Sequence, residues 1–228
     1  MAALRQSSSA AQAASPDASV ADIRTAQSVL ETEAAGLRSL AASLGAPFAA
    51  AVETLAGIAG RVAVTGMGKS GHVARKTAAT LASTGTPALF VHPAEASHGD
   101  LGMVLAGDAV LALSNSGETT ELADLLAHAR RFGLPVVAIT SKPDSTLARA
   151  ACVVLALPPA PEACPMGLAP TTSTTMQMAL GDALAVALLT RRGFGPAEFQ
   201  RFHPGGRLGA KLRRVRDLMH SGEAIPIG

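Results

Sequence analysis

The sequence predicts an α/β domain: a doubly wound, five-stranded parallel sheet flanked by helices. Five short apolar, β-branched runs occur along the chain, and they lack the polar alternation of strands that have one solvated face. Stretches of helical character separate several of them. Because ligands of such sheets bind beyond the carboxyl ends of the strands, we expect residues just after each strand to carry function.

The first ordered element is expected to be a long amphipathic helix. Residues 1–18 are rich in Ala and Ser and show no hydrophobic period, so we predict a disordered tail. Ser19–Asp22 has the spacing of a capping box, and apolar residues then recur at helical intervals as far as Leu44. We expect this helix to pack on the core or on a sister subunit.

The strands and helices of the sheet region follow in order. The predicted strands are Arg61–Thr65, Ala88–His92, Ala109–Leu113, Pro135–Thr140 and Cys152–Leu157. Helices are expected over Lys69–Ser83 and Glu118–Phe132, each followed by a glycine at C-cap distance, Gly85 and Gly133. A nearly buried helix rich in Ala, Leu and Met is expected from about Thr171 to Arg192.

Length, composition and charge narrow the class of protein. With 228 residues and 48% hydrophobic side chains, the chain accommodates one full α/β core, which we assign to residues 19–212. A net charge of +2, scattered basic residues and the lack of Trp and Tyr argue against a nucleic-acid partner. No stretch approaches the roughly 20 apolar residues of a membrane span, and two cysteines are too few for a disulfide framework. We therefore expect a cytoplasmic protein without a membrane partner.

A hydroxyl-rich loop, Ser114–Glu121 (SNSGETTE), follows the third predicted strand. Its Ser114, Ser116 and Thr119 can donate to phosphate oxygens, and the start of the next helix adds N–H groups and a favourable dipole. Helix capping explains any one of these hydroxyls, but the cluster as a whole favours phosphate binding. The two glutamates of the loop would repel a polyphosphate, so we predict a monophosphate ligand.

The turn after the first strand, Gly66–Gly71 (GMGKSG), fits the pattern G-x-G-x-x-G. A dinucleotide site also needs an acidic residue at the end of the second strand, but that strand ends in His92 and the first acid, Glu95, lies beyond a proline. No nucleotide cofactor is therefore expected. The helix start with Lys69 and Ser70 suits an oxyanion or a phosphorylated sugar.

Histidines and a glutamate stand in loops at the predicted active edge. His98 and His203 lie in segments bounded by Gly or Pro, and Glu162 lies in a proline-rich segment after the fifth strand. A metal site made of His92, His98 and His203 would lack the close-spaced ligand pair typical of zinc sites, so no metal is expected.

Five separated segments of the chain, taken together, closely resemble the sugar-isomerase (SIS) domain of bacterial arabinose 5-phosphate isomerases, from about residue 20 to the end. The segments are Val64–His72, Leu81–Pro87, Phe90–Gly102, Ser114–Glu121 and Phe202–Gly209. The resemblance implies a sheet in flavodoxin-like order and a tetramer whose active sites are shared between subunits. It also implies interconversion of ribulose 5-phosphate and arabinose 5-phosphate, the reaction that opens the pathway to the Kdo sugar of lipopolysaccharide.

The resemblance also implies roles for individual residues. Isomerisation requires a base acting between C1 and C2, a group that moves a proton between O1 and O2, and stabilisation of the enediolate. Lys69 is assigned to the enediolate, Glu162 or His98 to the carbon base, and His203 to the oxygen-borne proton. Glu121 would orient Lys69 or a sugar hydroxyl. The phosphate would be held by Ser70, Ser114, Ser116 and Thr119.

Other interpretations of the sequence stay open. Members of the resembled family usually continue into two regulatory CBS domains; residues 213–228 resemble the linker that opens the first, and we expect the pair to be absent here. The same fold serves as a non-catalytic sugar-phosphate sensor, and other members act on heptose or hexulose phosphates. The sequence does not separate a lipopolysaccharide pathway from capsule or sugar-alcohol metabolism.

Overall fold

Five parallel strands form one sheet in the order β2-β1-β3-β4-β5 in the computed structural model, which describes residues 16–203. The strands are β1 (Val62–Gly66), β2 (Ala88–Val91), β3 (Ala109–Leu113), β4 (Val136–Thr140) and β5 (Val153–Ala156). In the central register, Val62 of β1 pairs with Ala88 of β2 on one side and with Ala109 of β3 on the other. The predicted fold class is confirmed, and each strand lies inside its predicted run except for Gly66, one residue beyond.

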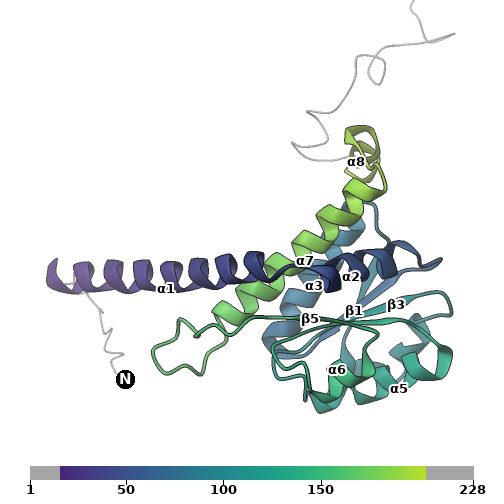
Figure 1. The fold of residues 1–228 in the computed structure, drawn as a ribbon, viewed down its shortest axis with the longest axis horizontal. Helices are drawn as coiled ribbons and strands as arrows, with labels where there is room; N and C mark the ends of the chain where they lie inside the picture. The colour runs from purple at the N-terminus through teal and green to yellow at the C-terminus, as the bar shows by residue number, and fades with distance from the viewer. Residues whose placement is uncertain (1–15, 204–228) are drawn as a thin grey trace, which may run out of the picture.

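Helices cover both faces of the sheet (Figure 1). One face carries α2 (Ala46–Ala56), α3 (Gly68–Ser83) and α7 (Thr172–Arg191), and the other carries α4 (Pro93–Ala96), α5 (Ala123–Phe132) and α6 (Thr146–Ala150). Two single 3₁₀ turns, Asp100–Met103 (η1) and Thr120–Leu122 (η2), lie in the connections. The predicted glycine stops are confirmed: Gly85 follows α3 with φ +90°, and Gly133 caps α5 in the left-handed conformation.

Alternate side chains of the central strands enter two separate cores. In β3, for example, Leu111 packs against α2, α3 and α7, whereas Val110 and Ala112 pack on the side of α5 and α6. Every residue of β1, β3 and β4 is buried, which is why these segments show no polar alternation in the sequence. The edge strands β2 and β5 are only partly buried.

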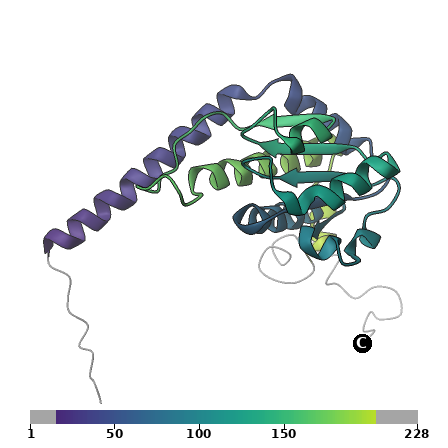
Figure 2. The ribbon, with the colours of Figure 1, turned by 90° about the horizontal axis from the view of Figure 1, so that it is seen from below.

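The N-terminal helix α1 (Pro16–Ser43) projects far from the sheet (Figure 2). The part of the helix near its C-terminus packs on α7, and the part before it leaves Ile23 58% and Leu30 67% exposed. The predicted start at a Ser19 capping box is wrong, because the helix already begins at Pro16, with Asp17 in its first turn. Helix α2 is absent from the elements predicted from the sequence; it begins after Gly45 with a proline in its first turn.

The last helix in the described part of the chain is α8 (Pro196–Phe202), which follows α7. Within residues 16–203, no single helix has the length and apolar character that crossing a membrane requires. Only α1 and α2 taken together meet those criteria, and they meet at a bend of 80°.

Candidate functional site

The sheet has a topological switch point between β1 and β3. These neighbouring strands are followed by helices on opposite faces, α3 after β1 and α5 after β3, so the carboxyl ends of β1 and β3 are where sheets of this kind form their ligand crevice. Lys69 and Ser70 occupy the first turn of α3 at this crevice; Lys69 is exposed and Ser70 is half-buried. No side-chain hydrogen bond caps this helix within residues 16–203, which leaves its first N–H groups open to a ligand.

The hydroxyl-rich loop after β3 forms a turn stabilised by its own side chains. The buried Ser114 Oγ accepts from the N–H of Gly117 at 3.0 Å and lies 2.7 Å from Thr119 Oγ1. Gly117 has φ +67°, and a Cβ there would collide with Ser145. Ser116 is exposed, and its Oγ accepts from the N–H of Glu118 at 3.2 Å. Ser114 and Thr119 therefore shape the loop, while Ser116 presents the accessible hydroxyl.

The next two helices along the sheet have starts that are capped by the protein itself. At α6, Ser145 Oγ accepts from Ala148 N, and Glu118 Oε1 accepts from Thr146 N at 2.9 Å. Hydrogen bonding by Thr146, and the nearby Arg149 guanidinium, lower the pKa of Glu118. Glu118 therefore connects the hydroxyl-rich loop Ser114–Glu121, which is the candidate phosphate loop, to the start of α6.

Glu162 caps the start of α7. Its Oε2 accepts hydrogen bonds from the Thr171 N–H at 2.7 Å, the Thr171 hydroxyl at 3.0 Å and the Ser173 N–H at 3.2 Å. Partial burial raises the pKa of this carboxyl, but the donors of Ser173 and Thr171 outweigh burial and bring it below its ordinary value. Oε2 of Glu162 is therefore occupied by three donors and holds the start of α7.

A pocket of about 440 Å³ lies between the phosphate loop and Glu162. Its polar lining comprises Asn115, Ser141, Lys142, Glu162 and Ser173. Lys142 also lines a second hollow together with Ser116 and Glu118, so this lysine stands beside the candidate phosphate loop. Asn115, Lys142 and Ser173 are not among the site residues predicted from the sequence. The signal that could have identified Lys142 is its position two residues after β4.

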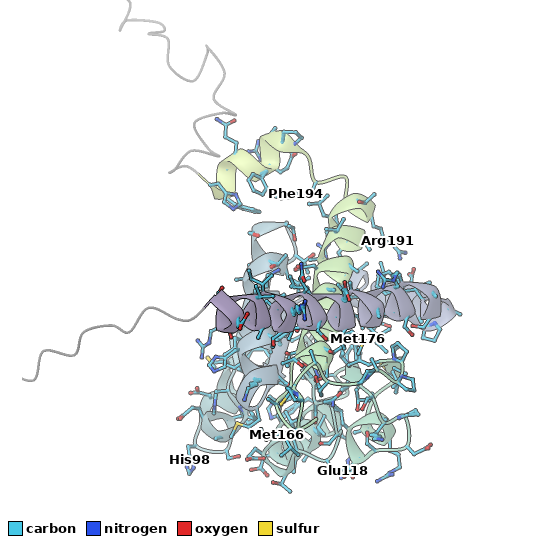
Figure 3. The ribbon with its side chains drawn as sticks, turned by 90° about the vertical axis from the view of Figure 1, so that its left-hand side faces the viewer. His98, Glu118, Met166, Met176, Arg191 and Phe194 are labelled. Atoms are coloured by element: carbon cyan, nitrogen blue, oxygen red, sulfur yellow. The ribbon has the colours of Figure 1, made fainter. Side chains whose placement is uncertain are left out.

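His98 and Glu121 are both exposed at the carboxyl edge of the sheet. His98 follows α4, and Figure 3 shows it at the same end of the molecule as Glu118 and Met166. Glu121, the last residue of the hydroxyl-rich loop, lies in the 3₁₀ turn η2 and accepts a hydrogen bond from the Thr120 hydroxyl at 3.2 Å. None of the contacts in residues 16–203 joins Glu121 to Lys69.

His203 lies at the opposite end of the molecule. Helix α7 starts beside Glu162 and runs for 20 residues, about 30 Å, toward the amino ends of the strands. There Phe194 packs against Gly85, in the turn that leads into β2. At the end of α8, His203 stacks on Phe199 with ring centroids 3.8 Å apart. Within one chain it therefore does not meet Lys69, and His92, His98 and His203 form no cluster.

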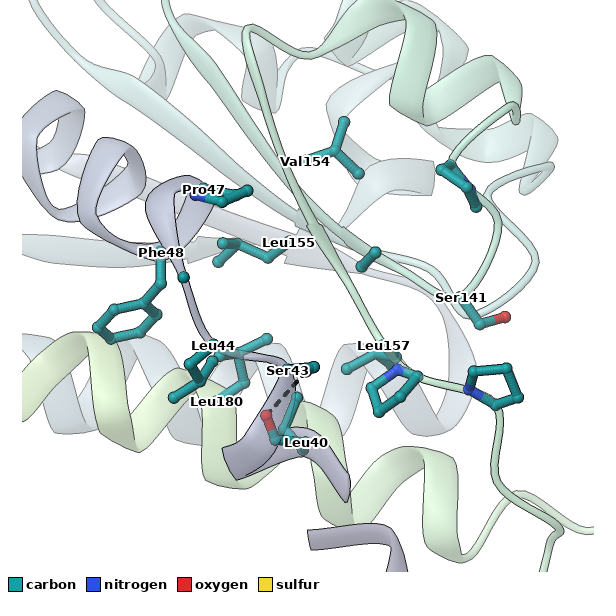
Figure 4. Close-up of a pocket in the computed structure, with 15 residues that line it drawn as sticks. Leu40, Ser43, Leu44, Pro47, Phe48, Ser141, Val154, Leu155, Leu157 and Leu180 are labelled. Carbon is teal, nitrogen blue, oxygen red and sulfur yellow. Dashed lines mark hydrogen bonds between the residues drawn. The ribbon is translucent and has the colours of Figure 1, made fainter. Parts of the chain in front are cut away.

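A third hollow, of about 410 Å³, lies at the bend between α1 and α2, beside β5 (Figure 4). Its lining is mainly apolar, including Leu44, Phe48 and Leu157, and contains no ionisable side chain. The polar pocket between the phosphate loop and Glu162, not this hollow, offers groups suited to chemistry.

Comparison with known proteins identifies the family to which this fold and this site correspond. The SIS domain family matches residues 58–187, more than half of the chain. The Pseudomonas aeruginosa arabinose 5-phosphate isomerase KdsD is 54% identical over 205 residues, which are 90% of this chain and 63% of that protein. The chain therefore spans just over three fifths of the length of such curated relatives.

Solved structures agree in fold. An Escherichia coli CFT073 protein, solved in complex with arabinose 5-phosphate, is 38% identical with a TM-score of 0.78, covering 84% of this chain and 100% of that one. The fold is shared by the sugar isomerase domain of an RpiR transcription factor from Sphaerobacter thermophilus. That structure is 23% identical with a TM-score of 0.64, and the match covers 76% of this chain and 93% of that one. By its sequence match and its five-stranded architecture, the chain belongs to the SIS domain family.

Proposed function

We propose that this chain is an arabinose 5-phosphate isomerase, which interconverts D-ribulose 5-phosphate and D-arabinose 5-phosphate. The observation that carries the proposal is that the uncapped helix start with Lys69 lies beside the hydroxyl-rich turn at the switch point, since Gly66 at the end of β1 pairs with Leu113 at the end of β3. Free N–H groups and a lysine suit a phosphorylated sugar. Relatives of 54% identity that bear this activity support it.

The proposed mechanism moves one proton between C1 and C2 through a cis-enediolate. The Lys69 ammonium stabilises the negative charge that develops on O1 and O2, and the phosphate binds at Ser70, Ser116 and the free N–H groups of the two helix starts. His98 is the better candidate for the carbon base, because Glu162 is engaged as the cap of α7. Glu121 would orient a sugar hydroxyl. Ser114 and Thr119 act by shaping the loop.

A second copy of the chain would supply His203. The distance between the end of α8 and the crevice leaves this histidine without a role in its own subunit. The exposed apolar residues of α1 offer a surface on which another copy could pack, consistent with the tetramer that the family resemblance implies. In this arrangement His203 of one subunit moves the oxygen-borne proton in the site of another.

The direct test is conversion of ribulose 5-phosphate followed by NMR, with loss of the C2 proton of arabinose 5-phosphate to deuterated solvent as a second readout. Wild type should convert the ketose at a rate that scales with protein. A lack of conversion would favour the alternative that this chain is a non-catalytic sugar-phosphate sensor. The RpiR sugar isomerase domain has the same fold. Conversion would also make the lipopolysaccharide pathway to Kdo the first place to look for the consumer of the product.

Subunit complementation tests the shared site. Lys69→Met and His203→Asn should each be inactive as pure proteins, because each removes one part of every site. Mixed after dissociation and reassembly, they should recover up to about a quarter of wild-type activity, because some sites then combine an intact Lys69 with an intact His203. Absence of recovery in verified mixed oligomers would place both residues in one subunit's site or remove His203 from the chemistry.

A further inference from the structure

Two polar groups in the pocket beside Glu162 are buried without a hydrogen-bond partner. Ser173 is only 6% exposed, and its Oγ meets no partner with hydrogen-bond geometry among the described residues, although it lies against the Glu162 carboxylate. The side-chain oxygen of Asn115 is likewise buried and unpartnered. Both residues line the same pocket of about 440 Å³. A buried polar group without a partner destabilises the protein, so a bound molecule that supplies partners would recover this cost.

The backbone holds both groups in place. The carbonyl of Asn115 accepts from the Ser141 N–H at 3.1 Å and from the Ser141 hydroxyl at 2.8 Å, which pins the loop to the end of β4. Ser173 is fixed through its N–H, which donates to Glu162 at 3.2 Å. The two unpartnered oxygens therefore belong to rigid positions, and little ordering is required when a ligand meets them.

The position of the pocket identifies the part of the ligand that would reach it. Asn115 directly follows Ser114 in the phosphate loop, and Ser173 stands on the far side, at the start of α7. A sugar whose phosphate is held by the loop would extend its carbon chain toward this wall. The groups that a sugar offers there are hydroxyls, each of which donates one hydrogen bond and accepts others.

We propose that Asn115 and Ser173 form a subsite that binds the hydroxyls of the sugar chain and selects their stereochemistry, with Glu162 as the residue that positions Ser173. This inference rests on the proposed function for the identity of the ligand. A site built to hydrogen-bond a hydroxyl discriminates against the analogue that cannot satisfy it, because the protein groups are then left unpaired. The subsite therefore acts on choice among sugar phosphates more than on affinity for phosphate.

The test compares ligands that share a phosphate and differ at one hydroxyl. Apparent dissociation constants of ribulose 5-phosphate, its C3 epimer xylulose 5-phosphate and inorganic phosphate are measured by calorimetry for wild type, Ser173→Ala and Asn115→Ala. Wild type should prefer ribulose 5-phosphate. Each variant should lose about tenfold of that preference, with the inorganic phosphate constant changed less than about twofold.

Thr174→Ala is the matched control, because its hydroxyl donates to the Thr171 carbonyl at 2.9 Å and does not line the pocket. It should keep the wild-type preference. Equal weakening of all three ligands in the pocket variants would indicate structural damage, and an unchanged preference would indicate a pocket occupied by water; either result overturns the subsite. Calorimetry needs no turnover, so a wild type that binds and discriminates the epimers without converting them contradicts the proposed activity alone.

Discussion

The helix starts at the carboxyl edge of the sheet differ in how their N–H groups are satisfied. The start of α3, after β1, and the turn η2, after β3, have no side-chain cap within the described chain. The protein's own side chains cap two other starts. Ser145 and Glu118 cap α6, after β4, and Glu162 caps α7, after β5. The uncapped α3 and η2 flank the switch point of the sheet. The capped α6 and α7 lie to one side of it, and the short α4 after β2, which also lacks a side-chain cap, lies to the other.

This difference separates groups that a ligand must satisfy from groups that the fold satisfies alone. A helix start carries a partial positive charge, and an anion stabilises it whether the anion is a substrate phosphate or a side-chain carboxylate. Where Glu118 and Glu162 already supply that anion, no phosphate is needed. Substitutions at the uncapped starts of α3 and η2 should change catalysis and binding. Substitutions at the capped starts of α6 and α7 should change the stability of the fold.

The largest effect is expected at the open start of α3. Lys69→Met should lower kcat/KM for ribulose 5-phosphate by about 10²–10³-fold, because it removes the cation that stabilises the enediolate. Lys76→Met on the same helix is the matched control; Lys76 pairs with Asp182 on the surface, so its loss should leave turnover within about twofold. Steady-state kinetics on both variants decides the point, and equal losses would show that the effect belongs to α3 stability instead.

The capped start of α7 should respond in stability. Glu162→Ala removes the acceptor of three hydrogen bonds and should cost about 2 kcal/mol in the free energy of unfolding by urea. Glu162→Gln keeps an acceptor oxygen and should recover most of that loss while retaining measurable turnover. If Glu162→Gln is as stable as wild type yet loses more than about 10³-fold in turnover, Glu162 is the carbon base and the comparison between the two starts fails.

A smaller loss is expected at α6. Ser145→Ala removes the N-cap acceptor of this five-residue helix but leaves Glu118 in place, so the loss should be about 1 kcal/mol in unfolding free energy. Its kcat should stay within about twofold of wild type, since Ser145 does not contact the crevice between β1 and β3. A large fall in kcat without a fall in stability would mean that the shape of the neighbouring phosphate loop depends on Ser145.

The sheet could be predicted almost completely from the sequence, and the chemistry of the site only in part. Buried parallel strands leave uninterrupted apolar runs, and glycines at C-caps mark where α3 and α5 stop, so these elements follow from local pattern. The short helices α6 and α8 carry too few residues to show a period. The start of α1 was misplaced because a capping-box spacing inside a helix looks the same as one at its start.

Side-chain roles resisted prediction because they depend on long-range contacts. Nothing near Glu162 in the sequence shows that its carboxylate accepts from residues nine and eleven positions later. Ser114 and Ser116 look equivalent in sequence, yet one is buried and engaged while the other is exposed. Similarly, the distance between His203 and Lys69 follows from the length and direction of α7, which only the folded chain reveals.

The smallest expected effect is a pH dependence of stability that belongs to Glu162. Its pKa is lower in the folded protein than its ordinary value, because the donors of Ser173 and Thr171 outweigh burial. Its contribution to stability is therefore complete above the unfolded-state pKa of about 4.3 and is lost as the pH falls through the folded-state pKa. Subtracting the unfolding free energy of Glu162→Gln from that of wild type isolates this group from the other carboxylates. The difference should be constant between about pH 7 and pH 5 and shrink as the pH falls through the folded-state pKa of Glu162. A difference that grows on acidification would mean that the cap acts in its protonated form.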